Sequence, residues 1–359
     1  MWGFGINLAE IPQTVRVIKK TGLGNKSTCG VYRRGPMLER FPVDANDFGG
    51  PVLVTGAGGC IGSWVLALLT RARVPVVAFD LSEDKRRPRL LMNEDALAGV
   101  TWITGDIANT EDVSKAVQDN AANAIIHLAA LQVPFCAADP VAGARANVVG
   151  TVNVFEAARH NGLKRLAYAS SVAVHGAPSD SPFLTTLYGA YKLCDETIAR
   201  VYYQDWGVSS VGMRPSIVYG VGRDQGMSSK PTVALLAAAA GLDYTVPFSG
   251  PMGALHAGEV ASAFIKAVSK EREGAPVFDI NGVATTVEHW VEILRQTQPE
   301  ARINVEGEAL PFPGDLSDKP LRDFLGDYGT IDLEFGVRET FSAFKDLLAR
   351  GNISADNLS

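Results

Sequence analysis

The stretch Pro51-Val-Leu-Val-Thr-Gly-Ala-Gly-Gly-Cys-Ile-Gly62 decides the fold of this chain. Its apolar run forms a short buried strand, and the glycines that follow form a turn that opens a helix. Gly56 permits the tight turn, Gly59 lets the backbone approach phosphate oxygens, and Gly62 allows the helix to pack against the sheet. The helix N-terminus offers free N–H groups and a positive dipole end to an anion. The stretch therefore predicts a site for the pyrophosphate of a dinucleotide.

Short apolar runs alternate with helical patterns beyond this motif. The patterns predict strands at 52–55, 76–80, 101–105, 124–130, 165–170 and 209–214, and helices at 61–73, 111–119, 141–161 and 188–206. Strands that alternate with helices are joined by right-handed crossovers, which build a parallel sheet. The predicted fold class is α/β, a Rossmann-type doubly wound parallel sheet with a smaller C-terminal substrate-binding region.

Three parts of the chain differ in pattern. Residues 1–48 lack periodicity and carry seven Lys or Arg against four acids, so we expect a flexible extension outside the fold. The alternatives are a targeting segment, or a chain that starts too early, with Met37 as the natural first residue. Residues 49–220 are expected to form the cofactor-binding domain with the catalytic residues. Residues 221–359, with helices at 286–296 and 339–350, are expected to form mainly a substrate-binding cap.

Composition narrows the class of protein. A net charge of -6 argues against a nucleic-acid surface, which needs a clustered basic face. No apolar run approaches the roughly 20 residues that span a bilayer. The four cysteines suit a reducing compartment, because they lie far apart without a Cys-x-x-Cys pair, and they predict no metal site. We expect a soluble, cytoplasmic protein with a small-molecule substrate and neither nucleic-acid nor membrane partners.

The second predicted strand ends at Asp80, 18 residues after Gly62. A carboxylate there can accept hydrogen bonds from the adenine ribose and repel a 2′-phosphate, which favours NAD over NADP. An ordinary strand-end aspartate that caps the next turn is the alternative, and the cations at 85–87 could reach a phosphate. Asp106 and Ile107, after the third strand, are placed to touch the adenine ring, although Asp106 could equally cap the following helix.

A tyrosine and a lysine stand one helical turn apart at Tyr188 and Lys192. Free tyrosine titrates near 10, too high for a base at neutral pH. The ammonium of Lys192 and a positive nicotinamide ring would favour the phenolate, so that Tyr188 could exchange a proton with a substrate hydroxyl. Ser171, just after the fifth strand, could hydrogen-bond the substrate oxygen. Tyr191 competes for the role of Tyr188 but points elsewhere on the helix.

Ten motifs follow one another in the order typical of one family: Thr55–Gly62, Asp80, Asp106-Ile107, His127-Leu-Ala-Ala130, Asn147-x-x-Gly-Thr151, Ser170-Ser171, Tyr188–Lys192, Arg214-Pro215, Tyr219-Gly220 and Leu255-His256. From about Pro51 to about Arg350, the chain resembles the extended short-chain dehydrogenases/reductases of the NAD-dependent epimerase/dehydratase family. The motifs together are highly specific for the family and only weakly specific for its reaction.

The resemblance implies a set of site residues. Ser171, Tyr188 and Lys192 would form the catalytic triad, and Lys192 would also hold the nicotinamide ribose. The implied NAD-binding residues are Gly56, Gly59, Cys60, Ile61, Gly62, Asp80, Asp106, Ile107, Leu128, Ala129, Ala130, Asn147, Tyr188, Lys192 and Pro215. The implied substrate residues are Gln132, Ser171, Arg223 and His256, although Arg223 and His256 could equally hold structural hydrogen bonds. Relatives commonly dimerise through the helix that carries Tyr188 and the one before it, so a homodimer is possible.

Departures from the family pattern bear on the substrate. Ala173 stands where many members carry threonine, and His175 where tyrosine is usual. The segment from Gly176 to Tyr188 is short and lacks the usual acidic-then-proline pattern. Ile217 replaces a phosphate-binding asparagine of nucleotide-sugar enzymes, and its side chain cannot donate a hydrogen bond.

These departures favour an NAD-dependent dehydrogenase that acts on a secondary alcohol of a small polyol, sugar or sugar acid. The first alternative is a nucleotide-sugar epimerase similar to UDP-glucose 4-epimerase, which would use the same residues and keep its NAD bound. A non-catalytic NAD(H)-sensing protein is a more distant alternative, because a sensor need not retain all three catalytic residues.

Overall fold

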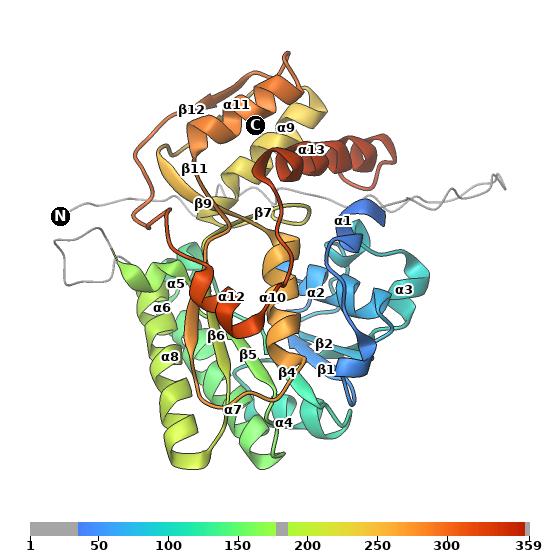
Figure 1. The fold of residues 1–359 in the computed structure, drawn as a ribbon, viewed down its shortest axis with the longest axis vertical. Helices are drawn as coiled ribbons and strands as arrows, with labels where there is room; N and C mark the ends of the chain where they lie inside the picture. The colour runs from blue at the N-terminus through green and yellow to red at the C-terminus, as the bar shows by residue number, and fades with distance from the viewer. Residues whose placement is uncertain (1–34, 177–185, 356–359) are drawn as a thin grey trace.

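The computed structural model describes residues 35–176 and 186–355 (Figure 1). At its centre is a sheet of seven parallel strands in the order β10-β6-β5-β4-β1-β2-β3. This architecture confirms the predicted α/β class with a doubly wound parallel sheet. The strands are β1 (Val52–Thr55), β2 (Val76–Asp80), β3 (Thr101–Thr104), β4 (Ala124–His127), β5 (Leu166–Ala169), β6 (Val211–Pro215) and β10 (Val277–Ile280).

Helices cover both faces of this sheet. Along β1, Val52 and Val54 pack into one cluster of buried side chains and Leu53 into another, because successive side chains of a strand point to opposite faces. With both faces buried, the strand reads as a continuous apolar run. One layer contains α2 (Cys60–Arg71) and α10 (Ala257–Val268), and the other contains α4 (Thr110–Gln118), α7 (Gly150–His160) and α8 (Leu187–Trp206).

The strand order reverses at β1. Strands β2 and β3 lie on one side of it, and β4, β5 and β6 lie on the other. The connections that leave β1 and β4 therefore diverge and open a crevice at the carboxyl ends of these two strands. The fold thus places a ligand crevice directly beside the glycine turn at 56–59.

The predicted helix at 141–161 contains an irregularity. It consists of α6 (Pro140–Ala144), a π-helical turn at Arg145–Val149 and α7. A wider turn leaves little trace in the spacing of apolar residues, so the sequence pattern does not reveal it. Such turns occur often at functional sites, and this one carries Asn147.

Two elements of the sheet layer lie beyond the predicted domain boundary at residue 220. Helix α10 packs against α2 and the sheet, and β10 pairs with β6. Helix α10 is buried almost all round, so it lacks the polar face that marks a surface helix in a sequence. Strand β10 is short and contains Asp279. Residues 257–280 therefore belong to the sheet layer, which corrects this part of the predicted division.

The remaining C-terminal elements gather at one end of the molecule, above the carboxyl ends of the strands (Figure 1). A three-stranded sheet joins β7 (Ile217–Tyr219) in parallel and β11 (Val283–Thr286) antiparallel to β9 (Pro251–His256). The other elements are β8 (Tyr244–Val246), β12 (Ile303–Val305), α9 (Lys230–Ala240), α11 (Val287–Thr297) and α13 (Leu333–Ala349), with α12 (Lys319–Leu325) beside β10.

The described part of the N-terminal segment is packed into the fold. Met37 and Phe41, at and just after α1 (Gly35–Glu39), are 2% and 1% exposed. The Phe41 ring stacks on His256 with centroids 6.3 Å apart. The expectation of a flexible extension is therefore wrong for residues 37–48. Only two buried side chains anchor this segment, and two residues are too few to produce a periodic pattern in the sequence. Residues 1–34 lie outside the described part.

Short elements complete the described chain: α3 (Glu94–Ala98), α5 (Val133–Ala138) and single helical turns at Ala45–Asp47, Pro88–Leu90, Val172–His175 and Met227–Ser229. Within residues 35–176 and 186–355, no helix combines the length and the apolar character needed to cross a membrane.

Candidate active site

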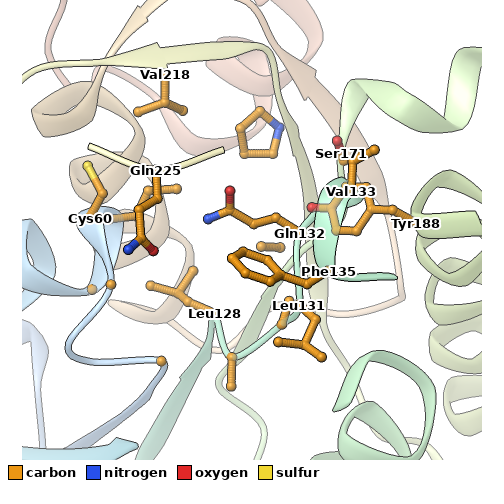
Figure 2. Close-up of a pocket in the computed structure, with 18 of the residues that line it drawn as sticks. Cys60, Leu128, Leu131, Gln132, Val133, Phe135, Ser171, Tyr188, Val218 and Gln225 are labelled. Carbon is orange, nitrogen blue, oxygen red and sulfur yellow. The ribbon is translucent and has the colours of Figure 1, made fainter. Parts of the chain in front are cut away.

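A cavity of about 490 Å³ lies at the carboxyl ends of the parallel strands (Figure 2). Its walls come from the glycine turn after β1, the ends of β2 and β5, the loop at 128–135 after β4, and the start of α8. The segment at 215–228, between β6 and α9, completes the wall. Open α/β sheets bind ligands at this edge, so the cavity is the candidate active site.

The glycine turn leaves the N-terminus of α2 open toward the cavity. Gly56 has φ +68°, and a Cβ there would lie 2.7 Å from the Ala129 backbone nitrogen. A Cβ on Gly62 would lie 2.3 Å from the Gly56 carbonyl oxygen, so α2 packs against the turn only because Gly62 lacks one. No side chain caps α2, and its first turn contains no acid. Its N–H groups are therefore available to an anion.

Asp80, the last residue of β2, faces this turn from the neighbouring strand. Its Oδ2 accepts a hydrogen bond from the Gly58 N–H, and its Oδ1 accepts one from the Leu81 N–H, each at 2.8 Å. Burial raises the pKa of the carboxyl, against the opposing effect of these donors. Asp80 lines the cavity, where its remaining lone pairs can accept hydrogen bonds from ribose hydroxyls.

The three cations that follow β2 are each paired with a carboxylate. Their pairs are Lys85 with Glu83 at 2.5 Å, Arg86 with Asp84 at 2.6 Å, and Arg87 with Asp224 at 2.7 Å. A 2′-phosphate would have to displace a carboxylate from one of these cations and approach Asp80 as well. The arrangement therefore fits NAD better than NADP.

Lys192 and Tyr188 meet on α8 at the wall of the cavity. The Lys192 ammonium lies 5.9 Å from the centroid of the Tyr188 ring. Its side chain is 2% exposed, and its Nζ donates a hydrogen bond to Asp195 Oδ2 at 3.1 Å. Burial by itself lowers the pKa of Lys192, but the Asp195 carboxylate, with smaller contributions from Tyr188 and Cys136, outweighs burial and the net shift is upward. Lys192 therefore stays charged beside the phenol.

Ser171 approaches Tyr188 because α8 packs closely against the loop after β5. A Cβ on Gly189 would lie 2.4 Å from the Ala173 carbonyl oxygen, so only glycine permits this contact. Ser171 Oγ accepts a hydrogen bond from the Ala173 N–H at 3.2 Å, and within residues 35–176 and 186–355 its own hydrogen has no acceptor and can donate to a ligand. Figure 2 shows Ser171 and Tyr188 at the same wall of the cavity.

An ionic network lies behind Ser171. Ser170 Oγ donates to Glu196 Oε1 at 2.5 Å, and Arg214 holds both oxygens of Glu196 at 2.7 Å. His175 Nε2 lies 2.6 Å from Asp279 Oδ1 on β10, which also faces Arg214. The histidine that replaces the usual tyrosine thus ties the turn after Ser171 to the edge strand. The neighbouring segment 177–185 lies outside the described residues.

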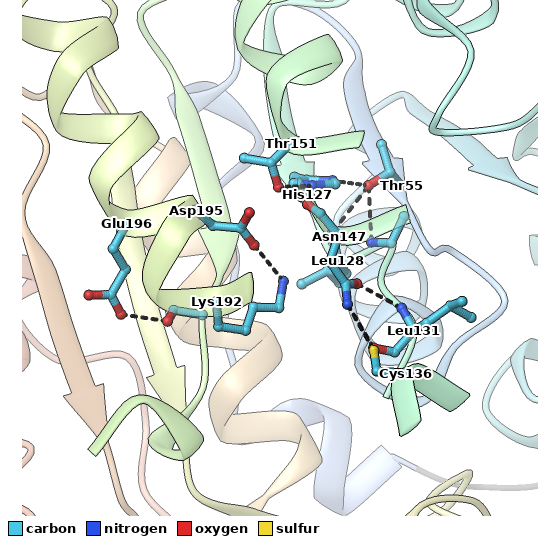
Figure 3. Close-up of polar contacts among 12 residues, drawn as sticks. Thr55, His127, Leu128, Leu131, Cys136, Asn147, Thr151, Lys192, Asp195 and Glu196 are labelled. Carbon is cyan, nitrogen blue, oxygen red and sulfur yellow. Dashed lines mark hydrogen bonds and ion pairs between the residues drawn. The ribbon is translucent and has the colours of Figure 1, made fainter. Parts of the chain in front are cut away.

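A second network fixes the loop after β4 (Figure 3). Thr55 Oγ1 accepts hydrogen bonds from the N–H groups of Leu128 and Ala129, so its own hydrogen goes to His127 Nδ1 at 2.7 Å. His127 Nε2 then donates to Thr151 Oγ1 at 3.3 Å. Burial and the charge of Lys192 lower the pKa of His127 to about 3, so the ring is neutral.

Most of the residues that the sequence singles out line the cavity: Gly56, Gly59, Cys60, Ile61, Gly62, Asp80, Ile107, Leu128, Ala129, Ala130, Gln132, Ser171, Tyr188, Lys192, Pro215 and Arg223. Asp106 does not line it, because its Oδ1 accepts from the Ala108 N–H and closes a turn before α4. Asn147 is fully buried and braces Leu131 from behind, through its Oδ1 on the N–H and its Nδ2 on the carbonyl.

His256 is the clearest correction. The sequence suggests a substrate contact, yet the ring is 0% exposed and lies away from the cavity. Its Nδ1 accepts from the Gly258 N–H and caps α10, and the rings of Trp64 and Tyr219 pack edge-on against it. Burial lowers its pKa to about 3. The alternative structural role is therefore the correct one.

Several residues of the site cannot be recognised from the sequence motifs alone. Asp195 carries a usable signal, since an acid three positions after a helical lysine can pair with it. No sequence motif indicates the other missed residues, which line the cavity only because loops distant in sequence converge there. They are Val133, Phe135, Val218, Gln225, Met227, Ser228 and Phe312.

The crevice at the strand-order reversal of the parallel sheet, the uncapped helix N-terminus and the strand-end aspartate together define a dinucleotide-binding protein of the Rossmann type. Residues 52–281 match the NAD dependent epimerase/dehydratase family. The chain belongs to this family, which confirms the resemblance seen in its motifs, and NAD is its cofactor. The residues present fit this cofactor, because Gly56–Gly62 offers an anion site and Asp80 offers ribose acceptors.

Relatives and solved structures carry several activities. The chain is 32% identical over 171 residues to a UDP-glucose 4-epimerase from Azospirillum brasilense, covering 45% of this chain and 47% of that protein. It spans about half the length of the curated relatives it matches.

Two solved structures show the breadth of the fold. A Thermus thermophilus UDP-glucose 4-epimerase in complex with NAD gives a TM-score of 0.69 at 24% identity, covering 82% of this chain and 99% of that one. An L-threonine dehydrogenase from Cupriavidus necator gives 0.71 at 21%, covering 83% and 99%. At these identities the likeness establishes the fold.

The position of Asp80 predicts weaker NAD binding in the Asp80→Ala variant. Loss of the ribose acceptors should raise the Kd for NAD at least several-fold, as measured by titration calorimetry. Glu94→Ala is the matched control, because Glu94 is an exposed acid paired with Arg89 outside the cavity. Equal NAD affinity in the wild type and the Asp80 variant would show that this carboxylate does not hold the ribose.

The buried His256 predicts a loss of stability in mild acid. Its pKa is about 3 in the folded chain and about 6.5 when unfolded. The unfolded chain therefore binds more protons below about pH 6.5, and the free energy of unfolding falls as the pH drops. In His256→Asn the amide oxygen can still cap α10 without titrating. Urea unfolding at pH 7 and pH 5 should show a smaller loss for the variant. Equal losses would contradict the assignment.

Proposed function

We propose that this chain is an NAD-dependent oxidoreductase that interconverts a secondary alcohol and a ketone on a small polyol, sugar or sugar acid. The observation that carries the proposal is Tyr188 beside the buried, charged Lys192, in one cavity with Ser171. A proton acceptor, a cation that favours its ionised form and a hydroxyl donor are the groups that such a reaction needs.

When bound, NAD would supply the acceptor for the hydride. Tyr188 takes the proton of the substrate hydroxyl, and in the reverse direction returns it to the carbonyl oxygen. Ser171 donates a hydrogen bond to the same oxygen, which orients the substrate and stabilises the charge that develops there. Lys192 stabilises the phenolate of Tyr188 through its positive charge, which Asp195 maintains in a buried position.

The cavity supports a substrate without a nucleotide. Ile217 lines it at the position where nucleotide-sugar enzymes place an amide, and Val218, Met227 and Phe312 add apolar surface to the same region. We therefore favour a small substrate, and we assign the segment at 221–228 to its binding because this segment reaches the cavity wall.

A nucleotide-sugar epimerase is the second candidate, because the family and the named relatives include UDP-sugar epimerases. The two reactions differ in the fate of the hydride. A dehydrogenase releases NADH in proportion to the substrate consumed, whereas an epimerase returns the hydride and shows no net change in absorbance. A screen of polyols, sugars, sugar acids and UDP-sugars therefore separates them.

We also propose a homodimer through α8 and the helix before it. Leu193 and Val201 on α8, with Val149 before α7, expose 39%, 42% and 42% of their surface. Apolar side chains at these positions are suited to an interface between two copies.

The proton-transfer role predicts that Tyr188→Phe abolishes turnover and leaves the Kd for NAD nearly unchanged. Loss of a general base typically costs about 10²–10⁴-fold in rate. NADH formation by the wild type and the variant, on each active substrate of the screen, measures the effect. Tyr191→Phe is the matched control, since its hydroxyl donates to the Pro140 carbonyl and does not face the cavity. Turnover that survives in Tyr188→Phe would refute the proposed base.

A further inference from the structure

Three cations line the cavity, and one of them differs from the other two. Arg87 pairs with Asp224 at 2.7 Å, and Lys192 pairs with Asp195 at 3.1 Å. Among the described residues, no carboxylate lies within ion-pair distance of Arg223. A cation placed in a partly buried cavity without a counter-charge is costly. Arg223 is therefore the group in this cavity that an anionic ligand would compensate.

No charged partner contacts Arg223 within ion-pair distance among the described residues, although the Asp224 carboxylate and the Arg87 guanidinium act on its charge from further away. Its Nη2 donates a hydrogen bond to Ser228 Oγ at 3.1 Å. Its Nε is buried and has no hydrogen-bond partner among the described residues. Arginine carries five N–H donors and stays protonated in proteins. The guanidinium thus has further N–H groups that can bind a ligand, and the neutral hydroxyl of Ser228 does not balance its charge.

Gln132 is held close to the same guanidinium. A Cβ on Gly226, which has φ +97°, would lie 2.1 Å from Gln132 Oε1 and 3.4 Å from Arg223 Nη2. Glycine at 226 therefore leaves room for the amide and the guanidinium to sit together. Figure 2 shows the Gln132 side chain pointing into the cavity between the wall with Cys60 and the wall with Tyr188.

The charge of Arg223 acts on both ends of the cavity. It interacts electrostatically with Cys60 at the N-terminus of α2, with the neighbouring Asp224 and with Tyr188 at the reacting end, and Arg87 opposes it. Arg223 and Tyr188 line the same cavity, so a ligand bound to Arg223 would share that cavity with Tyr188. The acids that line the cavity would not compete, because Asp84 and Asp224 are already paired with arginines and Asp80 faces the glycine turn.

We propose that Arg223, Gln132 and Ser228 form a subsite for a carboxylate group of the substrate. The oxidised alcohol is then that of a hydroxy acid, such as a sugar acid, rather than of a neutral polyol. This inference rests on the proposed oxidoreductase function. The guanidinium binds the carboxylate with two parallel hydrogen bonds, and the amide and hydroxyl supply further donors. The distance from this subsite to Tyr188 selects which hydroxyl is oxidised.

The diphosphate of the cofactor offers the same oxyanion chemistry and is the other source of a counter-charge. The contacts of Arg223 favour the substrate, because Ser228 and Gln132 belong to the segment at 215–228 and the loop at 128–135. The uncapped α2 N-terminus already provides donors for the diphosphate. Separate measurements of acid binding and NAD binding distinguish the two sources.

The experiment compares matched acids and alcohols as ligands. Wild-type protein saturated with NAD is titrated calorimetrically with gluconate and glucitol, glycerate and glycerol, and galacturonate and galactose. At least one acid should bind more tightly than its neutral partner. In Arg223→Met this preference should fall by roughly 30-fold or more, as expected when a buried charge contact is lost. Ser228→Ala should show a smaller loss, and the Kd for NAD should stay within about two-fold in both.

Arg86→Met is the matched control, because Arg86 is paired with Asp84 and lies outside the cavity lining. Normal NAD binding by Arg223→Met also shows that the variant is folded. The proposal is overturned if no acid binds, if neutral partners bind equally well, or if the loss in Arg223→Met falls on NAD. Acid binding without any NADH formation would leave the subsite standing and refute the oxidoreductase. Turnover of neutral polyols that is unaffected in Arg223→Met would refute the carboxylate subsite and leave the proposed oxidoreductase function standing.

Discussion

The buried ion pair between Lys192 and Asp195 is the interaction on which the rest of the site depends. An ammonium removed from water would tend to lose its proton, and the adjacent carboxylate prevents this at the cost of its own burial. A charge kept close to Tyr188 by this pair is screened less than one exposed to solvent. The fold thus keeps a positive charge beside the proposed base whether or not the cofactor is bound.

The surrounding structure serves to place this helix face at the cavity. Gly189 lets α8 approach the loop that carries Ser171, and the π-helical turn carries the Asn147 amide that fixes the Leu131 loop. Three positively charged groups lie at different parts of the cavity wall: the N-terminus of α2, Lys192 and Arg223. In the function that we propose, the uncapped end of α2 would bind the cofactor diphosphate, Lys192 would act on the reacting oxygen through Tyr188, and Arg223 would bind the remainder of the substrate.

Much of the fold and the cofactor end could be predicted from sequence, because there the chemistry depends on neighbouring residues. The glycine turn, the strand that ends at Asp80 and the Tyr188–Lys192 spacing are each contained within one or two elements. The substrate end was not predictable in the same way, since Gln132, Ser228 and Phe312 meet only after distant loops converge. His256 shows the opposite error. A motif position suggested a substrate contact, but the ring is fully buried and Phe41, from the N-terminal segment, stacks on it.

The charge state of Lys192 can be observed directly. Protein labelled with ¹³C and ¹⁵N in lysine allows the Cε resonance of Lys192, assigned with Lys192→Met, to be followed by NMR as the pH rises. The wild-type resonance should keep its protonated position beyond about pH 10.4, where free lysine titrates. In Asp195→Asn, the main effect that opposes burial is lost and the transition should move to lower pH. A wild-type Lys192 that loses its proton below the free value would contradict the account.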